Sequence, residues 1–236
     1  ALARCLGAET LAEKTFDGTE YIYLPDLLAA EQDIADRLAL LTKRGKQTAH
    51  GLDKNIQILE LAQGFAYAPL QREAIRKAMT ENCLVLTGGP GTGKTTTVNA
   101  ILQLLEDQAE RVALCAPTGK AQARLRESLL QDGAKLALDD HPEIRQKLAE
   151  LPASTIHSLL RPDFETGGFR FNREHPLPCD LIVADECSMI PLSLMAALLE
   201  ALKPDARVVL LGDKDQLASV ESGAVLADLC DSAERN

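Results

Sequence analysis

Apolar residues in the later two thirds of the chain fall into short continuous runs, separated by segments with helical periodicity. Continuous apolar runs of this kind are typical of strands buried on both faces, and we expect strands at 83–86, 112–115, 181–184 and 208–211. Spacings of three and four residues predict helices at 70–79, 95–105, 120–130, 192–202 and 224–230. The alternation predicts an α/β fold, with a mainly parallel β-sheet and helices on both faces.

The first 65 residues follow a different pattern. We expect an extended run at 19–24 and helices at 25–41 and 56–63, the last ended by Gly64. The prediction is a small, mostly helical appendage and linker at 1–65, the end of a preceding domain, and one domain at 66–236. Within 131–180 we expect an irregular insertion, with a short helix at 142–151 and a hairpin-like turn at 164–169.

The composition narrows the class of protein. Apolar residues make up 46% of the chain, enough for a sizeable core, and no run approaches the ~20 apolar residues that span a bilayer. The six cysteines form no C-x-x-C pair and the N-terminus lacks a secretory pattern, so we expect reduced thiols, no structural zinc and a cytoplasmic location. The net charge of −10 excludes a broadly basic coat for nucleic acid, although residues 66–130 alone are net positive.

A phosphate-binding pattern lies between a predicted strand and a predicted helix. The segment 88–95, GGPGTGKT, matches G-x-x-x-x-G-K-[ST] at every position. Its glycines let main-chain N–H groups turn toward a phosphate, where the following helix presents its positive end. Lys94 should then reach the β- and γ-phosphates, and the Thr95 hydroxyl should bind Mg²⁺. The alternative is a glycine-rich turn without a ligand, which the full match in this context disfavours.

Two carboxylates, Asp185 and Glu186, follow the predicted strand at 181–184. Adjacent carboxylates repel each other unless a cation lies nearby. Asp185 is placed to hold Mg²⁺ through water, and Glu186 to orient and deprotonate the water that attacks the γ-phosphate. The alternative is an acidic pair at the start of a helix.

Three other polar positions follow strand ends or stand alone. Gln216, after the strand at 208–211, could hydrogen-bond a terminal phosphate and report its loss, or lie in a plain polar turn. Thr118 and Lys120, after the strand at 112–115, could hold a nucleic-acid phosphate or cap a helix. His157 taken alone is more often a core or capping residue than a ligand.

Taken together, five segments resemble a superfamily 1 helicase of the RecD/TraA kind, over roughly residues 66–236. They are GGPGTGKTTT at 88–97, APTGKAQARL at 116–125, STIHSLL at 154–160, DECSM at 185–189 and GDKDQLASVESG at 212–223. The last is the most specific, because few other P-loop families follow the sensor glutamine with L-x-S-V-x-x-G. Cys187 departs from the alanine that is usual after the acidic pair, and the change in volume should be tolerated.

The resemblance implies a RecA-like P-loop ATPase domain that drives movement along single-stranded DNA from 5′ to 3′, with ATP and Mg²⁺ as cofactors. It implies hydrolysis by Lys94, Thr95, Asp185 and Glu186, and sensing by Gln216. It implies recognition of adenine by Gln71 and a DNA path along Pro117, Thr118, Lys120 and His157. The nucleotide-binding residues it implies besides Gln71 are Gly89, Pro90, Gly91, Thr92, Gly93, Lys94, Thr95 and Thr96.

In this family, a RecD subunit of exodeoxyribonuclease V works with nuclease-bearing partners in double-strand-break repair, so RecB- and RecC-like subunits are possible partners. A working motor also needs a second RecA-like domain of the same parent chain, which supplies arginines to the γ-phosphate. No such domain follows Gly223, and we expect this piece to bind ATP–Mg²⁺ but to hydrolyse it poorly. Alternatives are a P-loop ATPase of a non-helicase class, a subunit using ATP as a structural ligand, or a conjugative relaxase–helicase motor.

Overall fold

The computed structural model describes residues 11–16, 18–44, 51–105, 111–135, 146, 150–216 and 225–234. Five strands form one parallel sheet: β3 (Cys83–Thr87), β4 (Val112–Ala116), β5 (Ala153–Thr155), β6 (Leu181–Ala184) and β7 (Arg207–Gly212). Their order across the sheet is β3-β7-β6-β4-β5. The predicted α/β fold with a parallel sheet is confirmed.

Each face of the sheet carries its own hydrophobic core. Successive side chains of a strand point to opposite faces, so a continuous apolar strand contributes to both cores. In β6, for example, Ile182 and Ala184 lie in one core while Leu181 and Val183 lie in the other.

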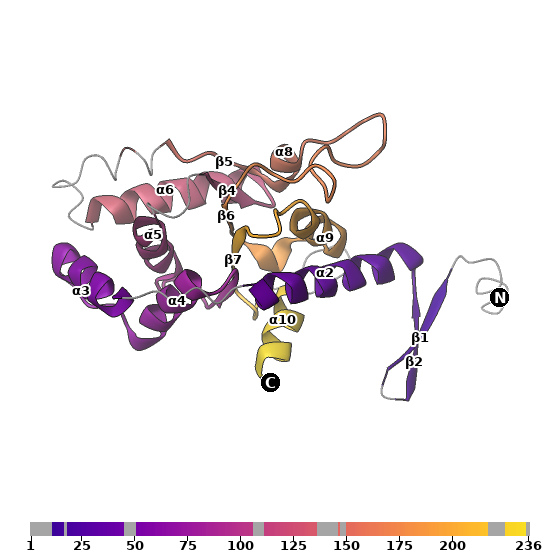
Figure 1. Cartoon of the computed structure of the whole chain (residues 1–236), viewed down its shortest axis with the longest axis horizontal. Helices are drawn as coiled ribbons and strands as arrows, with labels where there is room; N and C mark the ends of the chain where they lie inside the picture. The colour runs from indigo at the N-terminus through magenta and orange to yellow at the C-terminus, as the bar shows by residue number, and fades with distance from the viewer. Residues whose placement is uncertain are drawn as a thin grey trace.

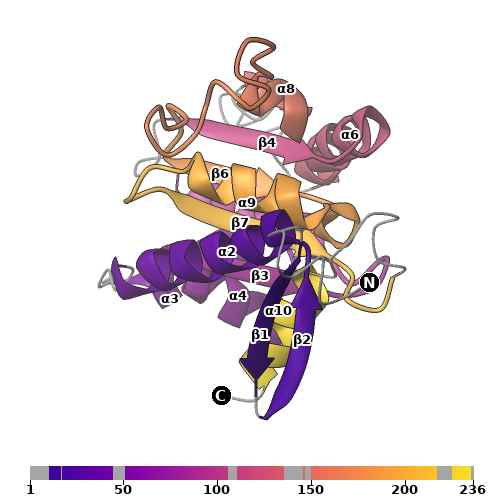
Figure 2. The same cartoon turned by 90° about the vertical axis from the view of Figure 1, so that its right-hand side faces the viewer.

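Helices cover both faces of the sheet, as Figures 1 and 2 show. The first core is covered by α2 (Pro25–Arg44), α8 (Ile156–Leu160), α9 (Leu192–Glu200) and α10 (Val225–Glu234). The second is covered by α3 (Leu52–Gln63), α4 (Pro69–Thr80), α5 (Lys94–Leu104) and α6 (Gly119–Lys135). None of the described helices is long and apolar enough to cross a bilayer.

The N-terminal segment begins with an antiparallel hairpin of β1 (Ala12–Phe16) and β2 (Thr19–Tyr23), which extends away from the sheet (Figure 1). Helix α2 packs along α9, and Arg37 donates from Nε to the Leu199 carbonyl at 3.0 Å and from Nη2 to the Leu202 carbonyl. Helices α2 and α3 therefore contribute to the two cores, and the domain boundary at residue 65 stays a prediction.

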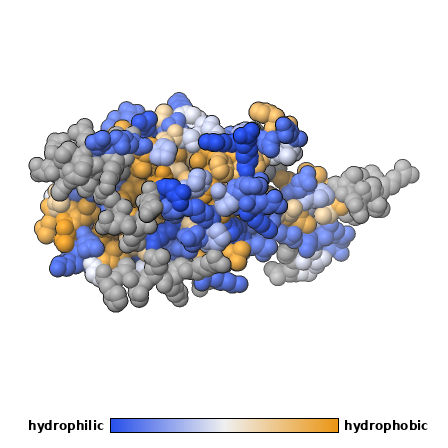
Figure 3. All heavy atoms as spheres, turned by 45° about the horizontal axis from the view of Figure 1, so that its top comes forward, coloured by the Kyte–Doolittle hydropathy of each residue, from blue (hydrophilic) through white to orange (hydrophobic). Residues whose placement is uncertain are grey.

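Gly64 ends α3 as predicted, because it adopts the left-handed conformation (φ 73°) that glycine tolerates best. Apolar side chains on the outer side of α3 remain exposed, among them Ile58 and Leu61. Figure 3 shows apolar atoms at the left-hand end of this face, where Figure 1 draws α3, and also across its upper middle, with hydrophilic atoms between and around them.

The segment 131–180 contains two elements that the sequence did not predict. Strand β5 extends the sheet beside β4, with Leu114 opposite Ala153, and α8 follows it directly. The hairpin-like turn at 164–169 is present: the Asp163 N–H donates to the Gly168 carbonyl at 2.9 Å, and Pro162 pairs with Phe169 in an isolated bridge. The helix expected at 142–151 lies largely outside the described residues.

Asp180 joins the amino ends of three strands. Its carboxylate accepts hydrogen bonds from Lys203 Nζ at 2.6 Å and from the Arg111 N–H at 3.0 Å. Its main-chain carbonyl accepts from the Arg207 N–H at 2.8 Å. Because β4, β6 and β7 begin next to Arg111, Asp180 and Arg207, this residue ties their starts together.

Replacing Asp180 by Asn should reduce the free energy of unfolding by about 1 kcal/mol at neutral pH. The Lys203 hydrogen bond, with that of Arg111, lowers the pKa of Asp180. A carboxylate with a lowered folded pKa stabilises the protein above its unfolded pKa of about 4, and this contribution is lost as the pH falls through the folded pKa. Thermal melts should show the two proteins converging below about pH 4. A gap that stays constant down to acid pH would contradict this assignment.

Candidate functional site

The phosphate loop connects β3 to α5 at the carboxyl edge of the sheet. The Gly88 N–H donates to the Gly212 carbonyl of β7 at 3.2 Å, which anchors the start of the loop. Gly91 and Gly93 have φ angles of 76° and 84°, in the left-handed region where a side chain is strained. Helix α5 then starts at Lys94, directly beside the turn, so its first N–H groups face the loop.

The Lys94 ammonium group lies over this loop. Nζ donates to the Gly88 carbonyl and, at 3.1 Å, to the Gly89 carbonyl. The Thr92 hydroxyl donates to the same Gly89 carbonyl at 2.9 Å. Lys94 therefore lies half-buried in the loop that the sequence predicts to hold a phosphate, with a positive charge available to an anion there.

Gln71 reaches the phosphate loop from α4. Its Oε1 accepts from the Ala68 N–H at 2.9 Å, and its Nε2 donates to the Gly93 carbonyl at 3.3 Å. A β-carbon on Gly93 would overlap Nε2, so the amide lies directly against the loop. The structure thus brings Gln71 together with Gly93 and Lys94, although 22 residues separate it from Gly93.

Asp185 and Glu186 directly follow β6, which lies two strands away from β3 across the sheet. Burial raises the pKa of Asp185 and the charge of Glu186 raises it further, while the Glu186 N–H and the charge of Lys94 lower it. The Glu186 N–H donates to Asp185 Oδ1 at 2.8 Å. The charge of Lys94 in the phosphate loop therefore acts on Asp185, the first of the two acids.

Glu186 has a φ of 54°, a left-handed conformation that is rare for residues with a side chain. Such conformations cost about 1–3 kcal/mol and gather at functional sites. Glu186 precedes the short 3₁₀ helix η2 (Cys187–Met189) without a side-chain cap on it. In the structure, the Glu186 carboxylate therefore does not act as a helix cap.

The segment after β7 lies against the phosphate loop. The Lys214 N–H donates to the Thr87 hydroxyl at 3.2 Å, and the Gln216 N–H donates to the Asp213 carbonyl at 3.2 Å. Asp213 is buried, and Gln216 is exposed at the same edge of the sheet. Residues 217–224, which include the L-x-S-V-x-x-G segment, lie outside the described residues.

The candidates for DNA contact lie at the ends of two other strands. Pro117, Thr118 and Lys120 follow β4, and His157 follows β5, which pairs with β4. Thr118 Oγ1 accepts from the Ala121 N–H at 3.2 Å, so Thr118 does cap α6. Lys120 and His157 are exposed. The structure brings these four residues to one part of the edge, separate from the phosphate loop at β3.

The structure contains two ring contacts near His157 that the sequence did not predict. His157 packs against Phe169 with ring centroids 5.9 Å apart, and the Arg161 guanidinium lies 5.5 Å from the Phe171 ring centre. Phe164, at the turn between α8 and β6, is 96% exposed. The alternation of Phe169 and Phe171 was the one sequence pattern that could have indicated these contacts. With few aromatic residues in the chain, this pattern did not suggest a ring cluster.

The cysteines near the site are thiols. Among the described residues all five cysteines are free. Cys115 and Cys187 are fully buried beside Asp185, and burial raises the pKa of Cys115 to about 12. Buried protonated thiols are unreactive, and Cys187 fits where the family has alanine, with its Sγ 3.2 Å from the Ala184 carbonyl.

A parallel sheet whose first strand leads into a glycine-rich loop, with an acid pair at a neighbouring strand end, defines a P-loop protein with a RecA-like sheet. The chain belongs to the AAA-domain family, whose model matches residues 71–222.

Three relatives indicate more closely which kind of P-loop protein the chain resembles. The chain is 48% identical over 210 residues to the RecBCD enzyme subunit RecD of Mycobacterium tuberculosis, a match covering 85% of this chain and 34% of the relative. It is 52% identical over 167 residues to the same subunit of Mycolicibacterium smegmatis, covering 67% and 29%. It is 36% identical over 222 residues to the ATP-dependent RecD2 DNA helicase of Deinococcus radiodurans, covering 94% and 28%. The resemblance to RecD-type proteins is confirmed, and the chain spans about a third of their length.

Proposed function

We propose that this chain is the first RecA-like motor domain of a RecD-type DNA helicase, which couples ATP hydrolysis to 5′ to 3′ movement along single-stranded DNA. The observation that carries the proposal is the phosphate loop between β3 and α5, in which Lys94 Nζ donates to the Gly88 and Gly89 carbonyls, at the same edge of the parallel sheet where Asp185 and Glu186 follow β6. The similarity to RecD subunits and to a RecD2 helicase supports the same assignment.

In this proposal the loop from Gly89 to Thr96 binds the triphosphate through main-chain N–H groups, and Lys94 moves from the loop carbonyls to the β- and γ-phosphates. Gln71 turns its amide to adenine. Glu186 orients the attacking water and accepts its proton, and Gln216 senses the γ-phosphate. The strained backbone of Glu186 supports a functional role for its side chain.

The available side chains suit Mg²⁺. Magnesium prefers hard oxygen ligands and keeps several waters, with one or two protein groups and the substrate phosphates completing the set. Among the described residues no three His, Cys, Asp or Glu side chains gather as a metal cluster. The hydroxyl of Thr95 and the half-buried carboxylate of Asp185 would hold the ion, which would neutralise charge on the phosphates.

The longer relatives suggest what surrounds the domain. We propose that a second RecA-like domain of the parent chain supplies an arginine to the γ-phosphate, a contribution of roughly 10³–10⁵ in rate in GTPases. The chain alone should therefore bind ATP–Mg²⁺ and hydrolyse it poorly. RecB- and RecC-like subunits and a cytoplasmic location belong to the same proposal.

The proposal is tested by coupling between nucleotide and DNA. In a polypeptide of the relatives' full length that carries this chain, single-stranded DNA should change the affinity for a non-hydrolysable ATP analogue and stimulate ATP turnover. DNA without effect on either quantity would favour a P-loop ATPase of a non-helicase class. Comparable DNA-stimulated multiple turnover by the 236-residue chain alone would refute the need for a second domain.

Replacing Lys120 by alanine should weaken binding of single-stranded DNA and reduce the slope of log K against log salt by about 1, because one phosphate contact is lost. Titrations of a labelled oligonucleotide at several salt concentrations measure both effects. Lys54, which is also exposed and lies on α3, is the matched control and should leave the slope unchanged. Thr118→Ala should instead lower stability by about 1 kcal/mol through loss of the helix cap. Unchanged salt dependence in the Lys120 variant would remove this lysine from the DNA path.

A further inference from the structure

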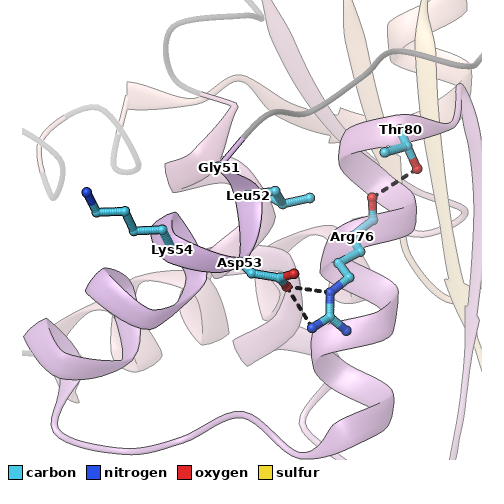
Figure 4. A pocket seen from close by; sticks show the side chains of 6 residues that line it. All are labelled: Gly51, Leu52, Asp53, Lys54, Arg76 and Thr80. Atoms are coloured by element: carbon cyan, nitrogen blue, oxygen red, sulfur yellow. Dashed lines mark hydrogen bonds and ion pairs between the residues drawn. The ribbon is translucent and has the colours of Figure 1, made fainter.

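The consecutive helices α3 and α4 are joined by two ion pairs, one near each end of α3. Helix α3 runs antiparallel to α4, so its first turn faces the later turns of α4 and its last turn faces the start of α4. At the first end, Asp53 pairs with Arg76 at 2.7 Å, as Figure 4 shows, and both side chains are largely exposed. At the second end, Glu60 pairs with Arg72.

The Glu60 pair differs from the Asp53 pair in burial and in the number of its partners. Only 9% of the Glu60 side chain is exposed. Its Oε1 accepts from Arg72 Nε at 2.8 Å and from the Tyr67 N–H at 2.7 Å, while Oε2 accepts from Arg72 Nη2. A bidentate carboxylate–guanidinium pair fixes both position and direction, because its two hydrogen bonds are parallel.

These hydrogen bonds hold residues on both sides of Gln71 in the sequence. Tyr67 immediately precedes Ala68, whose N–H holds Gln71 Oε1, and Arg72 immediately follows Gln71. Glu60 therefore fixes the main chain before the residue that caps α4 and the side chain just after Gln71. The other end of the Gln71 amide contacts the Gly93 carbonyl of the phosphate loop.

The connection between the two helices is also packed. Tyr67 is 3% exposed, donates its hydroxyl to Gln63 Oε1, and meets the Phe65 ring edge-on at a centroid distance of 5.3 Å. A buried ion pair contributes little net stability compared with apolar side chains of the same size, because both charges lose their water. Its distinctive effect is geometric, since it holds the start of α4 in one orientation relative to the phosphate loop.

We propose that Glu60 is a positioning residue for base recognition: through Arg72 and the Tyr67 N–H it holds Gln71 where its amide meets the base of the bound nucleotide. This inference rests on the proposed function, in which Gln71 contacts adenine. It extends the nucleotide site to α3, a helix that lies outside the segment matched by the family model.

The experiment measures dissociation constants of the 236-residue chain for ATP, GTP and inorganic tripolyphosphate, each with Mg²⁺. Glu60→Ala should reduce the preference for ATP over GTP about fivefold to tenfold, the worth of one or two hydrogen bonds, and leave tripolyphosphate affinity unchanged. Asp53→Ala, which removes the exposed ion pair between the same helices, is the matched control and should change none of the three constants. Glu60→Gln keeps an acceptor for the Tyr67 N–H but loses the charge, and should give an intermediate loss if the alanine variant does not fold.

A double mutant separates positioning from a merely structural effect. If Glu60 acts through Gln71, then Glu60→Ala should have no further effect on the ATP preference when Gln71 is already alanine. An equal loss of affinity for all three ligands, or an unchanged ATP preference in folded Glu60→Ala and Glu60→Gln variants, would overturn the inference. If Gln71→Ala itself leaves the preference intact, the adenine contact of the proposed function fails instead.

Discussion

Replacing Lys94 by alanine is expected to weaken binding of ATP by roughly 10- to 100-fold, since hydrogen bonds to charged groups contribute about 1.5–3 kcal/mol. In the structure the ammonium group donates hydrogen bonds to the Gly88 and Gly89 carbonyls of its own loop, and losing these bonds costs the nucleotide-free protein little. In the proposed complex it faces the β- and γ-phosphates. Calorimetric titration with a non-hydrolysable ATP analogue measures the change.

The control for this variant is Lys77→Ala. Lys77 lies on α4 at the surface, where it pairs with Glu73 at 2.9 Å, and its removal changes the net charge by the same amount. Its ATP affinity should stay within a factor of about two, because surface ion pairs contribute little. If both lysine variants lost affinity equally, a general charge effect would explain the result. An unchanged affinity in Lys94→Ala would mean that the loop does not hold the triphosphate.

Most of the sheet could be predicted because four of its strands are short, continuous apolar runs in the sequence. The run Leu181-Ile182-Val183-Ala184 is apolar throughout, and burial on both faces requires just that. Strand β5 could not be predicted in the same way, because Ala153-Ser154-Thr155 has no strongly apolar residue and lies at the edge of the sheet. Its conformation comes from pairing with β4, a contact between segments distant in sequence.

The candidate site shows the same difference between features set by local sequence and features set by contacts between distant segments. The phosphate loop and the acid pair are continuous motifs, and their placement at one sheet edge follows from parallel strands. The strained backbone of Glu186 and the approach of Gln71 to Gly93 depend on tertiary packing, and so do the contacts of Glu60 and the pairing of His157 with Phe169. From sequence alone, a carboxylate such as Glu60 in the last turn of a helix is expected to be solvated, and its partners become known only from the fold.

Replacing Glu186 by glutamine is expected to reduce ATP turnover by about 10²–10⁴-fold while ATP affinity is retained. Glutamine has the same shape and can still hydrogen-bond a water, but it cannot accept the proton that the attacking water loses. The measurement is single-turnover hydrolysis with single-stranded DNA in a polypeptide of the relatives' full length that carries this chain. Glu73→Gln, an exposed change of the same kind on α4, is the control and should hydrolyse ATP at the parent rate.

The two acids should respond differently, because Asp185 and Glu186 occupy different surroundings. Asp185 accepts a hydrogen bond from the Glu186 N–H, and the charge of Lys94 acts on its carboxylate. Because Asp185 is proposed to hold the metal, Asp185→Asn should weaken Mg²⁺-dependent ATP binding as well as turnover. Glu186→Gln should leave that binding intact. If the Glu186 variant lost affinity and turnover together, the glutamate would be holding the metal or the nucleotide. If turnover survived, another group would have to receive the proton, and the left-handed backbone at Glu186 would need a different explanation.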